Sequence, residues 1–456
     1  MKLEIVILAA GQGTRMKSRL PKVLHPVAGK PLLEHVVKTA LGLEPAAIHV
    51  VIGHGGEQVE DALCGYDLNW VIQESQLGTG HAVIQALPAI GSDSIVLVLY
   101  GDVPLTELST LQKLVQQAQA SPALLTAVLD NPQGYGRILR DAQGALTGVV
   151  EDKDASAEQL AIQEINTGLL AAPAEDFRAY LPRVKNENRQ GEYYLPDILG
   201  LAVAEGKVVA SSQASSELEI LGVNDRVQLN QVEREFQRRQ AEQLMRQGVS
   251  IADAGRLDIR GQLSCGEDVS IDVNVVFEGD VSLGDGVSIG PNCVLRDVQV
   301  ADGVAIHAMS HLQEAVIGAG SNVGPYARLR PGTVLAEGAR VGNFVETKKA
   351  LIGAGSKVNH LTYIGDCEMG TGVNIGAGTI TCNYDGVNKH KTDIGDGVFV
   401  GSNSTLVAPL QIADQGFVAA GSTITKALGD GELAVSRARQ RNIEGWQRPR
   451  KAEVKD

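Results

Sequence analysis

A six-residue apolar repeat runs through the second half of the chain, from Asp258 to about Ala427. Apolar residues stand six apart at Ile271, Phe277, Leu283, Ile289 and Leu295, and again at Ile394, Val400, Leu406, Ile412, Val418 and Ile424. An α-helix needs apolar recurrence near 3.6 residues, which this period does not match. A hexapeptide period is typical of a β-helix, whose coils stack apolar side chains into a continuous core. The sequence therefore predicts a β-solenoid.

Small residues recur in the solenoid at places where we expect tight corners. They are Gly284, Gly290, Gly318, Gly376 and Gly401. A glycine allows the backbone to turn where a side chain would clash.

The repeat is interrupted where a simple spacer would continue. Residues 381–392, between Ile380 and Ile394, form an insertion rich in polar and basic groups, and residues 343–349 place two lysines near a glutamate. Insertions in repeat proteins map to loops on one face, which is often the binding face. A rigid rod that only assembles copies of the chain is the alternative, but the two departures favour a binding site.

Bulk properties indicate a globular protein with more than one core. Its 456 residues exceed the length that one core usually serves. The net charge of −14 argues against broad affinity for nucleic acids or anionic membranes, although a phosphate site needs only a few local cations. The five cysteines form no CxxC pair, and the apolar run near the N-terminus is too short for a signal peptide or a membrane span. We therefore expect a cytoplasmic protein with no membrane span.

The first half alternates short aliphatic runs with helical patterns. The runs at 4–10, 48–53 and 94–100 are each followed by a candidate helix, at 32–43, 57–63 and 108–119. This alternation is typical of a mostly parallel sheet with helices on its faces. Because ligands of such folds bind at the carboxyl ends of the strands, we expect a ligand site there.

A glycine-rich motif follows the first predicted strand. It reads LAAGQGTRM over residues 8–16 and is followed by LPK at residues 20–22. Its glycines allow a tight turn whose amides approach phosphate oxygens, and Arg15 and Lys22 supply positive charge. A glycine-rich turn is weak evidence on its own, but the two closely spaced cations favour a phosphate site.

A second motif, VLVLYGDVP over residues 96–104, places Asp102 at the end of a hydrophobic strand. Magnesium prefers one or two protein oxygens together with substrate phosphates, which suits an aspartate at this position. Viewed alone, Asp102 is better explained as a turn residue before Pro104. The nearby QLGTGH at residues 76–81 has the small residues needed where a flat base stacks against backbone. Together the motifs predict a nucleotide-sugar site.

These motifs resemble those of the sugar nucleotidyltransferase (nucleotide-sugar pyrophosphorylase) family. Further stretches extend the resemblance over nearly the whole chain: GYGRI at 134–138, VE at 150–151, EINTG at 164–168, QGEYY at 190–194, GVN at 222–224, RLRPG at 328–332, GNFVE at 342–346, HLTY at 360–363 and NIGAG at 374–378. With them the chain is similar to the bacterial bifunctional enzymes that are both glucosamine-1-phosphate N-acetyltransferase and N-acetylglucosamine-1-phosphate uridylyltransferase. Such enzymes make UDP-N-acetylglucosamine for cell-wall and lipopolysaccharide precursors.

The resemblance implies a uridylyl-transfer site in the first half, with UTP and a sugar phosphate as substrates and Mg²⁺ as cofactor. It implies that Asp102 and Asn224 hold the metal, and that Arg15 and Lys22 act as catalytic cations on the triphosphate. The residues implied to bind UTP or the UDP-sugar are Leu8, Ala9, Ala10, Gly11, Lys22, Gln73, Gly78, Thr79, Tyr100, Gly101, Asp102, Gly136, Glu151, Asn166 and Asn224.

The resemblance also implies an acetyl-transfer site in the solenoid. The substrate amine must lose a proton before it attacks the acetyl-CoA thioester, and histidine is the usual base near neutral pH. His360 is implied as this base, with Glu346 to orient it or the amine, although a lone histidine in a β-coil is usually structural. The implied binders of glucosamine-1-phosphate are Arg330, Lys348, Tyr363 and Asn374, and those of acetyl-CoA are Ala377, Asn383, Tyr384, Ser402, Ala420 and Arg437.

The implied architecture is a Rossmann-like α/β nucleotidyltransferase domain over residues 1–224, a linker helix over 225–247 and a left-handed parallel β-helix domain with a tail over 248–456. The left-handedness is implied by the resemblance alone. The resemblance further implies a homotrimer, in which the tail folds against a neighbouring solenoid and Arg437 acts across the interface. Small molecules, and not nucleic acids, are the other expected partners.

Two other functions remain open at this point. One is a nucleotidyltransferase with a single activity, whose solenoid serves only to trimerise it; His360 and the insertion argue against this. The other is a regulatory subunit without catalysis; the presence of Arg15, Lys22, Asp102 and Asn224 argues against it. Acetyl-CoA binding and Mg²⁺-dependent product formation distinguish the three.

Overall fold

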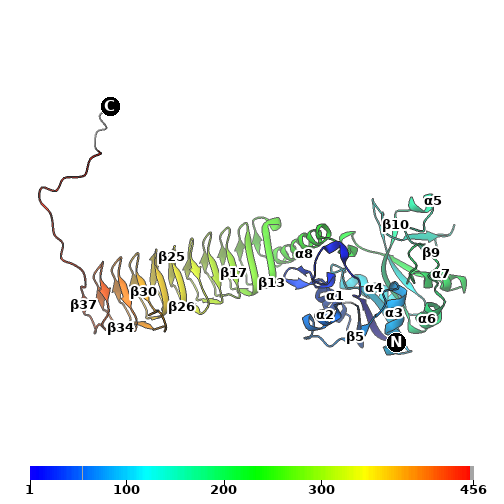
Figure 1. The fold of residues 1–456 in the computed structure, drawn as a ribbon, viewed down its shortest axis with the longest axis horizontal. Helices are drawn as coiled ribbons and strands as arrows, with labels where there is room; N and C mark the ends of the chain where they lie inside the picture. Colours follow the sequence, from blue (N-terminus) through cyan, green and yellow to red (C-terminus); the bar gives the residue numbers. More distant parts are fainter. Residues whose placement is uncertain (54, 452–456) are drawn as a thin grey trace. The chain divides into compact units, whose positions relative to one another are not determined.

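The computed structural model describes residues 1–53 and 55–451, and the chain divides into two compact units, Met1–Gln240 and Ala241–Asp456 (Figure 1). The first unit is built on one sheet, in which the order of the main strands is β11-β7-β10-β6-β1-β4-β5. In chain order these strands are β1 (Lys2–Leu8), β4 (Ala47–Ile52), β5 (Asn69–Ile72), β6 (Ser94–Tyr100), β7 (Ala123–Val128), β10 (Glu164–Pro173) and β11 (Ala210–Gln213). The hairpin of β8 (Arg137–Arg140) and β9 (Leu146–Val150) joins the sheet through β10.

The sheet is mixed, which refines the expectation of a mostly parallel one. The four strands β5, β4, β1 and β6 are parallel, as the alternating pattern predicts. The next strand, β10, runs antiparallel to both β6 and β7. The predicted α/β class is confirmed, and the strand ends that the motifs follow lie on the parallel part.

Helices cover both faces of the sheet because successive strand residues point to opposite sides. On β1, Ile5 and Ile7 belong to one apolar core and Val6 to another. The first core includes residues of α1 (Leu32–Leu41), α2 (Gly56–Ala62) and α4 (Leu108–Gln117). The second includes residues of α3 (Thr79–Ala86), α6 (Ala174–Tyr180) and α7 (Asp197–Ala204).

A buried polar group ties the first strands together at the end of the sheet opposite the motifs. Glu4 is only 6% exposed. It accepts hydrogen bonds from Ser94 Oγ (2.6 Å) and Gly91 N (2.9 Å), and its Oε2 lies 3.0 Å from His49 Nε2. Burial alone raises the pKa of Glu4, but these hydrogen bonds outweigh burial and hold the pKa below its ordinary value.

We expect Glu4→Gln to lower the free energy of unfolding of the first unit by about 1–3 kcal/mol at neutral pH. Because the pKa of Glu4 is lower in the folded state, its contribution is present above the ordinary pKa and is lost as the pH falls through the folded-state value. Thermal unfolding from pH 7 to 3 measures this. Below pH 4.5 the variant should lose less stability than the wild type. If the stability of both proteins fell equally with pH, the lowered pKa of Glu4 would be contradicted.

The second unit is a solenoid whose strands pair in parallel from coil to coil. One ladder runs through Ile271, Ile289, Ile306, Val323, Val341, Val358, Ile375, Val400 and Val418. Most of its steps are 17 or 18 residues, so a coil holds three hexapeptides, and the long step from Ile375 to Val400 contains the insertion. The predicted β-helix is confirmed; its handedness stays a prediction.

The strands of the solenoid belong to two sheets. The 11-stranded sheet consists of β12 (Ser250–Ile251), β14 (Ser270–Ile271), β16 (Ser288–Ile289), β19 (Ala305–Ile306), β22 (Asn322–Val323), β25 (Arg340–Asn343), β27 (Lys357–His360), β29 (Asn374–Ile375), β32 (Phe399–Val400), β35 (Phe417–Val418) and β37 (Leu433–Ala434). The 15-stranded sheet consists of β13 (Leu257–Cys265), β15 (Val275–Leu283), β17 (Val294–Arg296), β18 (Gln299–Val300), β20 (His311–Gln313), β21 (Ala315–Ile317), β23 (Arg328–Leu329), β24 (Thr333–Leu335), β26 (Glu346–Ile352), β28 (Tyr363–Met369), β30 (Ile380–Cys382), β31 (Thr392–Ile394), β33 (Thr405–Val407), β34 (Leu410–Ile412) and β36 (Thr423–Ile424). It contains two rows of short strands, β17-β20-β23 and β18-β21-β24, joined by the longer strands β15 and β26.

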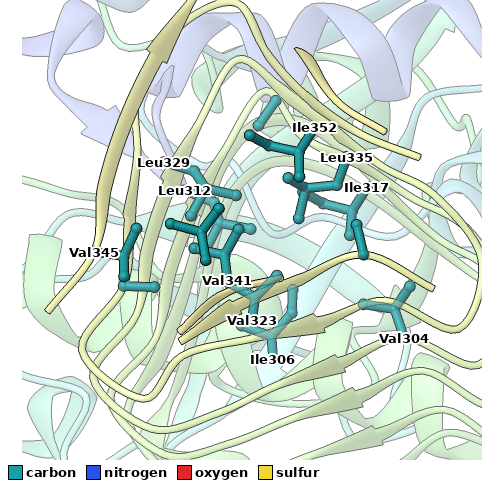
Figure 2. Close-up of a cluster of buried hydrophobic side chains, with 14 of the residues drawn as sticks. Val304, Ile306, Leu312, Ile317, Val323, Leu329, Leu335, Val341, Val345 and Ile352 are labelled. Carbon is teal, nitrogen blue, oxygen red and sulfur yellow. The ribbon is translucent and has the colours of Figure 1, made fainter. Parts of the chain in front are cut away.

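The residues of the six-residue repeat fill the interior of the solenoid. Figure 2 shows three groups of apolar side chains around the interior: Ile306, Val323 and Val341 in one, with Leu312 in the second and Ile317 in the third. All five are almost fully buried. Stacking of like side chains from coil to coil gives one continuous core.

The corner glycines lie where a side chain would clash, as expected, and the clash is with the next coil. A Cβ at Gly290 would lie 2.8 Å from Ala308 N, and one at Gly401 would lie 2.4 Å from Ala420 N, in the next coil. Neither glycine has a positive φ, whereas Gly286, with φ 64°, does. Glycine is therefore needed at these corners because the next coil approaches too closely for a side chain.

A long helix, α8 (Arg226–Arg246), covers the range predicted as a linker helix. Across residues 1–53 and 55–451, no helix has both the length and the apolar character that a membrane crossing requires.

Candidate functional site

A cavity of about 580 Å³ opens at the carboxyl ends of β1, β5 and β6 in the first unit. Eleven of the residues predicted to bind the nucleotide sugar line it: Leu8, Ala9, Ala10, Gly11, Lys22, Gln73, Gly78, Thr79, Tyr100, Asp102 and Asn224. Gln12, Gln76 and Glu192, which were not predicted, line it too. Gly101 donates its backbone N–H to Leu8 O (2.9 Å) and so joins the ends of β6 and β1. The motifs thus meet around one cavity.

Charged and amide groups meet at one end of this cavity. Lys22 Nζ pairs with Asp102 Oδ2 and also lies 3.3 Å from Asn224 Oδ1. The guanidinium of Arg15 donates to the same Asn224 oxygen over 2.9 Å. A single ammonium therefore contacts a carboxylate oxygen and an amide oxygen, two groups that lie far apart in the sequence.

Local geometry explains why these groups meet. Gly13 has φ 60°, and a Cβ there would lie 2.7 Å from Lys22 Cβ, so the glycine-rich loop packs directly on Lys22. The short helix η2 (Lys22–Leu24) begins at this lysine. Val223 N donates to Asp102 O over 2.9 Å, which places Asn224 beside the end of β6.

The oxygens of Asp102 and Asn224 fit a divalent cation that is shared with phosphates. Magnesium takes few protein oxygens when phosphates complete its octahedral shell. Contact of one cation, the Lys22 ammonium, with both oxygens shows that they lie within reach of a common ion. In the described part of the chain, no cluster of three or more His, Cys, Asp or Glu side chains forms a cage that could hold a metal without such phosphates.

The three residues predicted to bind the sugar lie together beside Tyr100. Asn166 N donates to Gly136 O over 2.8 Å, and a Cβ on Gly136 would lie 3.1 Å from Glu151 Oε1. Burial raises the pKa of Tyr100, and the negative charges of Glu151 and then Asp102 raise it further. Tyr100 is thus near both the predicted metal ligand and the predicted sugar-binding carboxyl.

The carboxyl of Glu151 has an unusual titration. Burial raises its pKa to about 7, with further contributions from nearby carboxylates, of which Asp197 is the largest. Asp197, at the start of α7, has its own pKa raised to about 6 by burial and then by Asp154. Asp197 was not among the residues predicted from the sequence, where its one signal is its place in the YYLPD stretch that follows QGE.

In the second unit, the predicted sugar-phosphate binders Arg330, Lys348 and Tyr363 lie on neighbouring coils. Glu346 and Lys348 are on β26, and Tyr363, on β28, pairs with Glu346. Arg330, just after β23, donates to Glu346 Oε1 over 2.8 Å. Within one chain Glu346 therefore pairs with Arg330, while its predicted role of orienting His360 or the substrate amine stays a prediction.

The insertion folds back over this face and adds Lys389, a cation that was not among the predicted sugar-phosphate binders. Lys389 lies beside Lys348 and lowers its pKa, chiefly through a hydrogen bond and charge repulsion, with a smaller contribution from Arg330. Asn383 Nδ2 donates to Asp366 Oδ2. A Cβ on Gly365 would lie 2.4 Å from Tyr363 Oη and 2.8 Å from Asn383 Nδ2, so these two side chains meet above that glycine.

His360 ends strand β27 in the 11-stranded sheet, and Asn343 of the preceding coil orients it. The two residues are paired in the ladder, and Asn343 Oδ1 lies 2.9 Å from His360 Nδ1. The amide oxygen accepts, so Nδ1 carries the proton and Nε2 keeps its lone pair. The ring is exposed, and it thus presents a basic nitrogen to solvent.

A row of small residues continues from His360 along one corner of the solenoid. His360 O accepts from Gly378 N (3.3 Å), Ala377 O from Asn403 N (2.7 Å), and Ser402 O from Gly421 N (2.8 Å). At the end of the row, the guanidinium of Arg437 donates to Ala420 O over 2.6 Å. The predicted acetyl-CoA residues Ala377, Ser402, Ala420 and Arg437 therefore follow one another on successive coils.

Within one chain the predicted acetyl-transfer residues form two groups. Arg330, Lys348, Tyr363 and Asn383 belong to the face of the 15-stranded sheet, whereas His360 and the row of small residues follow the 11-stranded sheet. Asn374 is on β29 between Lys357 and Phe399, and Tyr384 is exposed in the insertion. Among the described residues, no hydrogen bond or ion pair joins the two groups.

Comparisons with known proteins cover both units. Residues 5–163 match the model of the MobA-like NTP transferase domain, and residues 259–360 match that of the GMPPB C-terminal domain. A protein of Marinobacter nauticus called "Bifunctional protein GlmU" is 59% identical over 451 residues, which cover 99% of each chain. Proteins of the same name from Alkalilimnicola ehrlichii and Pseudomonas entomophila are 58% and 57% identical, over 98% and 99% of this chain and 96% and 99% of theirs.

Proposed function

Because the chain belongs to the family of bifunctional proteins called GlmU, we propose that each unit carries one of two consecutive reactions. The second unit transfers an acetyl group from acetyl-CoA to glucosamine-1-phosphate. The first unit then transfers a uridylyl group from UTP to the acetylated sugar phosphate, giving UDP-N-acetylglucosamine and pyrophosphate. The observation that carries the proposal is the meeting of Lys22 with both Asp102 and Asn224 at one end of a nucleotide-sized cavity.

Uridylyl transfer needs positioning and charge neutralisation more than it needs a protein nucleophile. A phosphate oxygen of the sugar phosphate attacks the α-phosphorus of UTP and expels pyrophosphate. Arg15 and Lys22 neutralise charge on the phosphates, and backbone amides of the loop at residues 8–16 donate to them. Asp102 and Asn224 are the proposed ligands of Mg²⁺, which supplies a Lewis acid for the phosphate oxygens when it is bound.

Gly136, Glu151 and Asn166 are the proposed contacts of the sugar. A carboxylate accepts hydrogen bonds from two sugar hydroxyls, whereas a protonated carboxyl competes for them as a donor. With its pKa at about 7, Glu151 changes between these two states near neutral pH. The ionised form is therefore the sugar-binding form.

We expect kcat/KM for N-acetylglucosamine-1-phosphate to rise by about tenfold between pH 6 and 8, as a group with a pKa near 7 ionises. Glu151→Gln, which resembles the neutral acid, should stay near the low-pH value throughout. Ionisation of the sugar phosphate itself affects both proteins equally, so the difference between the two profiles isolates Glu151. Parallel profiles would contradict the proposed role.

In the second unit, His360 is the proposed general base. Its Nδ1–H is held by Asn343, which leaves Nε2 free to take the proton from the substrate amine as it attacks the thioester. Arg330, Lys348 and Lys389 form a cationic patch that suits the sugar phosphate, with Tyr363 beside it. Asn374 is a further proposed sugar contact. The row from Ala377 to Arg437, with Asn383 and Tyr384, is the proposed path for acetyl-CoA.

A homotrimer is the proposed assembly, because a site shared between copies would unite the two groups of acetyl-transfer residues. An exposed apolar row supports an interface on the solenoid: Met309, Tyr326, Phe344 and Leu361 are 46%, 51%, 54% and 64% exposed. All four have positive φ, which is uncommon for large side chains, and the rings of Tyr326 and Phe344 stack at 5.2 Å. Light scattering should give a mass near three times 48.1 kDa.

The test of the proposed function is one assay with glucosamine-1-phosphate, acetyl-CoA, UTP and Mg²⁺, in which free thiol and pyrophosphate are measured together. Both should appear, and pyrophosphate should depend on acetylation. Pyrophosphate from N-acetylglucosamine-1-phosphate, with no thiol from the first mixture, would leave a single uridylyltransferase. Neither product in either mixture would favour a regulatory protein.

A further inference from the structure

The side chain of Gln73 lies in the nucleotide cavity in a fixed orientation. Gln73 follows β5, is only 4% exposed and lines the cavity beside Gly78. Its Nε2 lies 3.3 Å from Gly78 O and 3.0 Å from His81 Nδ1. A backbone carbonyl can only accept, so the amide nitrogen must face this side. The amide oxygen of Gln73 then faces the other way, and in the described part of the chain no protein group donates to it.

His81 holds this orientation from behind the cavity. It lies on α3, does not line the cavity, and its Nε2 is 3.2 Å from Gln85 Nε2 one turn later, so amide nitrogens face both ring nitrogens and only one of them can donate. Gly78 O already holds the amide nitrogen of Gln73 on this side, so Nδ1 accepts and Nε2–H requires the half-buried Gln85 to turn its amide oxygen to the ring. A neutral imidazole donates at one nitrogen and accepts at the other. Acceptance at Nδ1 therefore requires the amide of Gln73 to present its nitrogen to the ring.

The backbone around His81 is itself firmly held. Gly80 N donates to Tyr193 O over 2.8 Å, and Leu195 N donates to Thr79 Oγ1 over 3.1 Å. A Cβ on Gly78 would lie 2.7 Å from Tyr193 O, so only glycine fits where the loop meets this strand of chain. The backbone that carries His81 is thus fixed by these contacts.

We propose that His81 is a positioning residue that fixes the amide of Gln73 with its oxygen toward the nucleobase, and that it thereby selects uracil over cytosine. This inference rests on the proposed function of the first unit. Uracil carries an N–H donor at N3, which pairs with an amide oxygen. Cytosine carries a lone pair at N3, which the same oxygen repels. If the amide turned over, Gln73 would offer a donor and accept cytosine.

The experiment compares kcat/KM for UTP and CTP in the full-length wild type, His81→Leu and His81→Asn. Leucine removes the acceptor, so the UTP-to-CTP ratio should fall by about five- to tenfold, which is the value of one hydrogen bond. Asparagine can place an amide oxygen near the position of Nδ1, so it should recover most of the lost selectivity. His81→Ala repeats the leucine comparison if leucine destabilises the unit.

Two controls separate positioning from a merely structural role. The ratio of UTP to 5-methyl-UTP should not change, because both bases carry the N3 donor, and acetyl transfer by the same samples should persist. Lower activity of His81→Leu with an unchanged UTP-to-CTP ratio would overturn the inference and leave the proposed function standing. A wild type that makes no UDP-sugar from UTP would overturn the proposed function, and the inference with it.

Discussion

Asp102→Asn is expected to lower uridylyl transfer by at least about 10³-fold and to leave acetyl transfer within about twofold of the wild type. The substitution keeps the shape of the side chain but removes the negative charge that faces Lys22 and, in the proposed reaction, the metal. An amide binds a divalent cation more weakly than a carboxylate does, and Asn224 already supplies an amide oxygen. Pyrophosphate release and thiol release, measured on the same preparation, report the two reactions separately.

The matched control for this prediction is Asp61→Asn, which removes one carboxylate from the exposed end of α2. It should leave both activities unchanged. Raising the Mg²⁺ concentration should recover part of the Asp102→Asn activity if the defect is in metal binding. Equal loss of both activities in Asp102→Asn would indicate a folding or assembly defect and would remove the support for a metal ligand.

The fold was largely predictable because apolar patterns report which side chains face a core. The six-residue spacing of Ile289 and Leu295 predicted the solenoid interior, and both are buried there. The direction of β10 was not predictable, because an antiparallel neighbour leaves the apolar pattern of a strand unchanged. A clash at Gly290 was expected, but the residue that causes it, Ala308, was not predictable, because its closeness depends on how two coils stack.

The grouping of candidate site residues was predictable where motifs follow neighbouring strands and not where it depends on how a loop or a coil folds back. Lys22 and Asp102 belong to two motifs that follow the neighbouring strands β1 and β6. Because parallel strands end at the same edge of a sheet, their meeting could be expected. Lys389 meets Lys348 only because the insertion folds back onto an earlier coil. Asn343 lies one coil before His360, so a coil length of 17 or 18 residues, once known, would have identified it.

His360→Ala is expected to lower acetyl transfer by about 10²–10⁴-fold, the usual contribution of a general base, while uridylyl transfer stays within about twofold. Alanine removes the only group in the row of small residues that can take the proton of the substrate amine. The strand pairing of His360 with Asn343 is made by the backbone, so the coil should keep its shape. Thiol release from acetyl-CoA with glucosamine-1-phosphate measures the loss.

Asn343→Ala provides the companion variant, because it leaves the imidazole in place but removes the acceptor that fixes its tautomer. We expect a smaller loss of kcat, about tenfold, with little change in KM, since Asn343 acts through the ring and not on the substrate. If His360→Ala retained acetyl transfer, the base would have to lie elsewhere. If Asn343→Ala lowered the kcat of acetyl transfer as far as His360→Ala does, the cause would be a distorted coil and not a lost tautomer. Thermal unfolding of the two variants would then reveal a lower stability of Asn343→Ala.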